Sequence, residues 1–155
     1  MEKVFIFLTS IIFLTACFEE DTADIPVEDY LIFGHFYGEC MGETCIETYK
    51  LTESALYEDT RDVYGISSSF DFVEMGHDKF LEVNDLPDYF PEELLHTDTT
   101  TFGCPDCVDQ GGLLLVLYED DQRRVWKIDM VKEQVPGYLH DFMDQVKEKI
   151  ARLSE

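Results

Sequence analysis

The sequence predicts an α+β domain, in which a C-terminal amphipathic helix covers one face of a mainly antiparallel sheet. Between residues 30 and 129, short aromatic and branched segments alternate with turn residues, a pattern typical of strands joined by hairpins. Residues 136–153 then repeat apolar side chains at helical spacing. With 155 residues, the chain has room for one domain of ordinary size.

The first half of this body predicts three strands in succession. Tyr30–Tyr37 is aromatic and branched, and Cys45–Leu51 alternates apolar with polar residues. Ala55–Asp59 forms a short third strand after a tight turn. Phe70–Glu74 and Lys79–Val83 are either short strands or irregular packing segments.

The second half predicts a hairpin and two helices. Pro91 stands at the first position of a short helix with acids in its first turn. Leu113–Tyr118 is a continuous apolar run, which predicts a central strand covered on both faces. Arg124–Asp129 returns as its hairpin partner, and a helix over 136–153 packs on the sheet. The apolar stripe of that helix comprises Leu139, Phe142, Met143, Val146, Ile150 and Leu153.

An apolar run that ends in a cysteine opens the chain. Val4–Leu14 would rise about 16 Å as a helix, too short for a hydrocarbon core of roughly 30 Å, and suits the apolar region of a signal peptide. Leu14-Thr15-Ala16-Cys17 resembles the lipobox of bacterial lipoproteins. The resemblance implies a signal peptide at 1–16 and diacylglycerol on Cys17. It also implies attachment to the lipid bilayer of the cell envelope, at the outer membrane.

An acidic segment links the lipid site to the body. Cys17 and residues 18–29 form a tether without apolar periodicity, and residues 30–155 form the globular domain. The acids either make a solvated, self-repelling spacer or resemble the surface-export signals of lipoproteins in Bacteroidota bacteria. The domain would therefore face either the periplasm or the outside.

Charge excludes two classes of partner. The chain has 34 acidic and 11 basic residues, a net charge of −23. Nucleic-acid binding needs clustered Lys and Arg on phosphates, so we expect no nucleic-acid partner. A polybasic membrane patch is excluded for the same reason.

Four cysteines lie in the body as two close pairs, Cys40 with Cys45 and Cys104 with Cys107. Export favours disulfides, and closing two short loops costs the least chain entropy, which favours local pairing. Pairing between the two groups stays open, because a disulfide that closes a longer loop stabilises the folded state more. Free thiols, a four-thiolate zinc site and a redox centre are further alternatives. The redox alternative is weakened because Cys107 leads into a strand rather than a helix.

The segments around these pairs carry a family resemblance. Tyr37-Gly38-Glu39-Cys40-Met41-Gly42-Glu43-Thr44-Cys45 and Gly103-Cys104-Pro105-Asp106-Cys107-Val108-Asp109-Gln110-Gly111-Gly112 are together similar to loops of small lipoproteins of Bacteroidota bacteria. The resemblance spans about residues 30–130. It supports a location in the envelope and implies no reaction.

Other side chains that could carry chemistry are scattered. The four histidines lack metal-ligand spacing, and the sequence shows neither a G-x-S-x-G motif nor a phosphate-binding loop. Asp106 and Asp109 flank Cys107 in a Gly-rich turn, where they either cap backbone N–H groups or bind a hard cation. Capping is the favoured interpretation.

The sequence therefore favours a membrane-anchored, non-enzymatic binding or structural module of the cell envelope. Its partner would be an envelope protein or another ligand, and no cofactor is expected. The alternative is a metal- or redox-active envelope protein that uses Cys40, Cys45, Cys104 and Cys107, with zinc as its metal.

Overall fold

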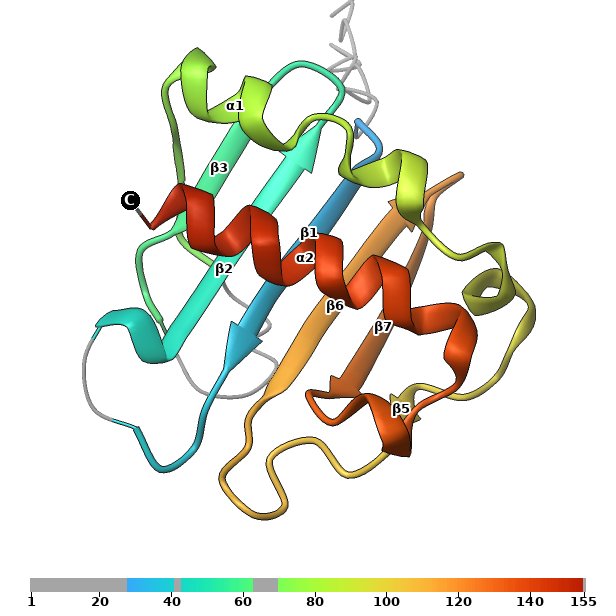
Figure 1. Cartoon of the computed structure of the whole chain (residues 1–155). Coiled ribbons are helices and arrows are strands. Elements are labelled where there is room, and N and C mark those ends of the chain that lie inside the picture. Colours follow the sequence, from blue (N-terminus) through green and yellow to red (C-terminus); the bar gives the residue numbers. More distant parts are fainter. Residues whose placement is uncertain (1–27, 41–42, 63–69, 155) are drawn as a thin grey trace, which may run out of the picture.

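The computed structural model describes residues 28–40, 43–62 and 70–154. The predicted signal peptide, the predicted lipidation site Cys17 and the predicted tether up to residue 27 lie outside the described residues. Figure 1 shows a sheet crossed on its front face by a long helix at the end of the chain. The fold class predicted from the sequence is thereby confirmed.

The sheet has seven strands in the order β4-β3-β2-β1-β6-β7-β5. Neighbouring strands are antiparallel, except that β5 runs parallel to β7. The bounds are β1 Tyr30–Phe36, β2 Ile46–Thr52, β3 Leu56–Asp59, β4 Phe72–Glu74, β5 Thr101–Phe102, β6 Gly112–Glu119 and β7 Gln122–Asp129.

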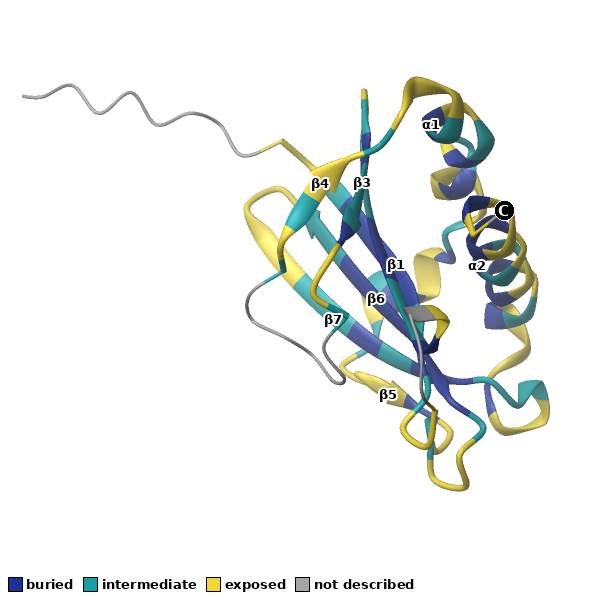
Figure 2. Cartoon of the chain, turned by 90° about the vertical axis from the view of Figure 1, so that its left-hand side faces the viewer, coloured by how far each residue is buried: buried dark blue, intermediate teal, exposed yellow. Residues whose placement is uncertain are grey.

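Helical segments lie on one side of the sheet, as the edge-on view in Figure 2 shows. The two α-helices are α1 His77–Val83 and α2 His140–Leu153. Short 3-10 turns are η1 Glu43–Cys45, η2 Leu86–Tyr89, η3 Glu92–His96, η4 Lys132–Gln134 and η5 Gly137–Leu139.

The centre of the sheet is β1, paired along its whole length with β2 and with β6. Side chains alternate between the two faces of such a strand. Leu113 and Leu115 of β6 belong to the core under the helices, whereas Leu114 and Val116 belong to a smaller cluster on the other face. The prediction that this run is covered on both faces is confirmed.

The apolar stripe of α2 faces the sheet as predicted. All six predicted side chains are buried, five of them in α2 and Leu139 in η5, and Val146 is 0% exposed. Phe142 meets the edge of Phe90, whose ring centroid lies 5.9 Å from that of Trp126 on β7. These contacts place one continuous core between helix and sheet.

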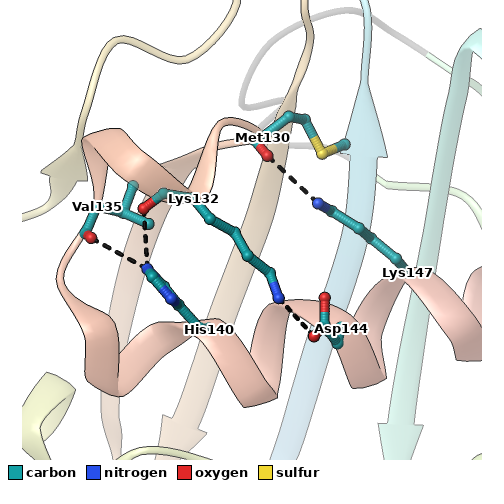
Figure 3. A network of polar contacts seen from close by, with 6 residues as sticks. All are labelled: Met130, Lys132, Val135, His140, Asp144 and Lys147. Atoms are coloured by element: carbon teal, nitrogen blue, oxygen red, sulfur yellow. Dashed lines mark hydrogen bonds and ion pairs between the residues drawn. The ribbon is translucent and has the colours of Figure 1, made fainter.

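Polar contacts fix the start of α2 against the turn that follows β7 (Figure 3). His140 Nε2 lies 2.8 Å from the carbonyl oxygen of Lys132 and 3.3 Å from that of Val135. Because carbonyls only accept, this nitrogen carries the proton and donates. Lys132 pairs with Asp144 at 2.5 Å, and Lys147 donates to the Met130 carbonyl at 3.3 Å.

A buried lysine joins α2 to the segment after α1. Lys149 is 4% exposed, and its ammonium donates to Asp85 Oδ1 at 2.5 Å and to the Glu82 carbonyl at 3.0 Å. The hydrogen bond from Lys149 holds the pKa of the Asp85 carboxyl below its usual value. The contact fixes the position of η2 over the sheet.

Three boundaries differ from the predictions. Residues 79–83 form most of α1 rather than a strand, because Phe80 and Val83 point into the core at helical spacing while Leu81 stays exposed. Pro91 is the N-cap of a 3-10 turn and not the first residue of a helix. The last α-helix begins at His140, since residues 137–139 form a 3-10 turn after Pro136.

Candidate functional site

A groove of about 650 Å³ lies at one end of the sheet. It is bounded by the start of β1, the ends of β2 and β6, and the segment from α1 to η3 that crosses above them in Figure 1. Its volume lies within the range of small-ligand sites. The groove is therefore a candidate binding site.

Apolar side chains form the inner wall of this groove. Leu31 and Leu51 from the sheet and Phe80 from α1 are buried beneath it. Phe90, Leu95 and Leu117 also line it and are only half-buried. These three therefore present apolar surface that a ligand would remove from water.

Carboxylates surround the mouth of the groove. Five lining residues are acidic and exposed, and the lining contains no Lys, Arg or His. In the described residues, no ion pair involves any of the five. A cleft with apolar walls and charges of one sign concentrates its field and attracts ions of opposite sign. The five are Asp29, Glu53, Asp88, Glu92 and Glu119.

The body cysteines form two disulfides, Cys40–Cys45 and Cys104–Cys107. The predicted local pairing is confirmed. The Cα atoms lie 5.6 Å apart in the first pair and 5.5 Å in the second. Disulfide sulfurs are not thiolates and do not serve as zinc ligands, so the zinc alternative requires reduced cysteines.

Both disulfide loops lie at the end of the sheet opposite the groove. The first joins the end of β1 to the start of β2, and the second precedes β6, whose first residue Gly112 pairs with Phe36. The loops touch: a side-chain carbon at Gly111, where φ is +76°, would collide with the ring of Tyr37. Glycine is therefore required for this close approach.

A buried carboxylate organises the second loop. Asp129 is 0% exposed and accepts hydrogen bonds from the backbone N–H groups of Cys104 and Val131, each at 2.8 Å. The Gln110 amide donates to the Cys104 carbonyl at 2.7 Å and lies 3.3 Å from Asp129. Asp106 accepts from the Gly111 N–H at 3.1 Å, which confirms capping by this residue. These hydrogen bonds account for the Asp and Gln residues of the Cys-Pro-Asp-Cys loop as structural residues that hold its backbone.

The four histidines are spread over the fold. His35 contacts the Thr44 carbonyl at 3.0 Å, and His77 stacks on Phe80. His140 bonds to carbonyls at the start of α2, and His96 ends η3. No group of three or more metal-binding side chains occurs in the described residues.

The groove was missed at the sequence level. Its apolar residues come from separate segments of the chain. The sequence predicts a strand at Leu31, Leu51 and Leu117, and it predicts no element at Phe90. Charge carried a partial signal, because acids follow the predicted strand ends at Glu53 and Glu119. Nothing in the sequence indicated that the α1–η3 segment closes over those ends.

The sequence matches no protein-family model and has no significant match among curated proteins. Within the described residues, no helix is both long and apolar enough to cross a bilayer.

Proposed function

We propose that this protein is a lipid-anchored, non-enzymatic binding protein of the cell envelope. The observation that carries the proposal is the Leu14-Thr15-Ala16-Cys17 motif at the end of a short apolar run. Cleavage before Cys17 and acylation of its thiol would tether residues 30–155 to the outer membrane. Several acyl chains hold a protein stably, since each buried methylene contributes about 0.8 kcal/mol.

Two features of the body support this proposal. Two disulfides suit an exported protein, because they persist in oxidising compartments and are rare in the cytosol. The apolar groove offers a ligand site, and the uncompensated carboxylates around it would select the ligand by charge. The partner in this function is a ligand or protein of the envelope.

Intact mass of the mature protein tests the anchor. The wild-type chain should begin at Cys17 and carry acyl-derived mass, and Cys17→Ser should lack that mass while residues 30–155 stay folded. Thr22→Ser, in the tether, is the matched control and should be acylated normally. Acyl mass on Cys17→Ser would disprove the proposal.

A second function is supported by the Cys104–Cys107 disulfide. Both residues are exposed, so a reductant or metal donor can reach a C-x2-C pair at the surface. Reduction would release thiols for redox chemistry or zinc. The two functions are separated by measuring the intact mass with and without thiol alkylation and by analysing the zinc content. Four alkylatable thiols and one bound zinc in the native protein would favour the second function.

A further inference from the structure

We propose that the groove at the start of β1 binds a cationic amphipathic peptide segment, in which apolar side chains are flanked by Lys or Arg. This inference rests on the proposed binding function and names the chemistry of the partner. It is carried by the combination of an apolar wall with an uncompensated acidic rim.

The wall selects apolar side chains. Phe90, Leu95 and Leu117 are half-buried beside the fully covered Leu31 and Leu51. Covering them removes apolar surface from water, which favours binding. A segment that has only charged side chains would bury no apolar surface against this wall.

The rim selects several separated cations. Asp29 precedes β1, Glu53 follows β2 and Glu119 ends β6. Asp88 and Glu92 lie in η2 and η3. One ammonium ion cannot reach all these positions. Lys and Arg on a peptide can, because their apolar stems lie along the wall while their charged ends reach the rim.

Charge also decides against two occupants from within this protein. Residues 18–28, which precede the groove, include five acids and no Lys or Arg, so the rim repels them. A second copy of the chain has a net charge of −23 and is repelled as well. The occupant that fits both wall and rim is therefore a positively charged partner.

A direct titration tests the proposal. The probe is a short synthetic peptide of alternating Leu and Lys pairs with a dansyl label, excited by energy transfer from Trp126. This is the single Trp of the chain, and its ring lies 5.9 Å from that of Phe90 at the groove. Full-length protein is used in phosphatidylcholine nanodiscs, with empty nanodiscs as the blank. We expect saturable binding that weakens as salt is raised.

Two altered peptides define the chemistry required. Replacing Lys by Glu should abolish binding, because the rim then repels the probe. Replacing Leu by Ser should also abolish binding, because the peptide then has no apolar side chains to pack on the wall. Equal binding of the Ser peptide would overturn the proposal, since charge alone would account for the signal.

Matched variants locate the site. A rim variant neutralises three exposed groove carboxylates, and a control variant neutralises three exposed carboxylates elsewhere, so both change the net charge equally. We expect the rim variant to bind about tenfold more weakly, or about 1.4 kcal/mol, and the control to change little. The rim variant is Asp88→Asn, Glu92→Gln and Glu119→Gln, and the control is Asp98→Asn, Glu133→Gln and Asp141→Asn.

A blocking variant completes the test. Asn84 is exposed and lines the groove at the end of α1, so Asn84→Phe should fill it and abolish binding without disturbing the core. Equal weakening by rim and control variants, or full binding by Asn84→Phe, would overturn the proposal.

Failure of the anchor would be seen separately. A protein without acyl mass on Cys17 would stay out of the nanodiscs, and the same titration would then be run in solution. If the unlipidated chain bound the peptide, the groove proposal would stand, and only the anchor would be disproved.

Discussion

Replacing Val146 with Asp should unfold the domain. The side chain is 0% exposed in the middle of the α2 stripe. Losing its apolar contacts costs about 2 kcal/mol, and leaving the new carboxyl without a partner costs about 1–3 kcal/mol. Keeping an aspartic acid neutral at pH 7, about three pKa units above its normal value, costs about 4 kcal/mol more. The loss of about 7–9 kcal/mol rivals the total stability of an ordinary domain.

Urea unfolding followed by Trp126 fluorescence measures this effect, because that side chain is buried in the same core. Val146→Ala should remain folded and lose about 2 kcal/mol. Gln145→Asp introduces the same side chain at the adjacent, less buried position and should cost less than about 1 kcal/mol. If the urea midpoint of Val146→Asp equalled that of the wild type, the stripe would not be buried.

Three further changes probe other contacts. Asp129→Ala removes the buried carboxylate that accepts from the backbone N–H groups of Cys104 and Val131, and should lower the free energy of unfolding by about 3 kcal/mol in urea; an unchanged midpoint would argue against this role. Cys104→Ser with Cys107→Ser opens a short loop and should cost about 2 kcal/mol by calorimetry while the domain stays folded; complete unfolding would contradict this estimate. Asp85→Asn should be less stable than wild type at neutral pH. Because Lys149 lowers the folded-state pKa of Asp85, the stabilisation is complete above the unfolded value of 3.8 and is lost as pH falls through the folded pKa. A difference that persists in acid unfolding curves below the folded pKa would refute this linkage.

The fold was predictable where a local pattern coincided with the final contacts. The continuous apolar run Leu113–Tyr118 predicts a strand covered on both faces, and the helical spacing of the stripe at the end of the chain predicts which side of that helix is buried; both predictions are confirmed. Lys79–Val83 was ambiguous because five residues contain little more than one helical turn. Its helical form depends on Phe80 and Val83 packing beside α2, a contact with a distant segment.

The candidate site was less predictable because it depends on neighbours in space. The two disulfides join residues close in sequence, so chain entropy was enough to favour the right pairing. The groove combines Leu31, Phe90 and Leu117 from distant parts of the chain. No local pattern encodes that convergence.

The position of β1 has a mechanical consequence. The predicted tether would lead directly into β1, which is held on both sides by seven residue pairs with β2 and seven with β6. Tension applied through residue 29 along the strand loads these two ladders in shear, so many hydrogen bonds share it at once. A strand at the edge could be peeled away pair by pair from one end. Attachment at the central strand would therefore let the domain bear a pull from the proposed anchor without first losing an outer strand.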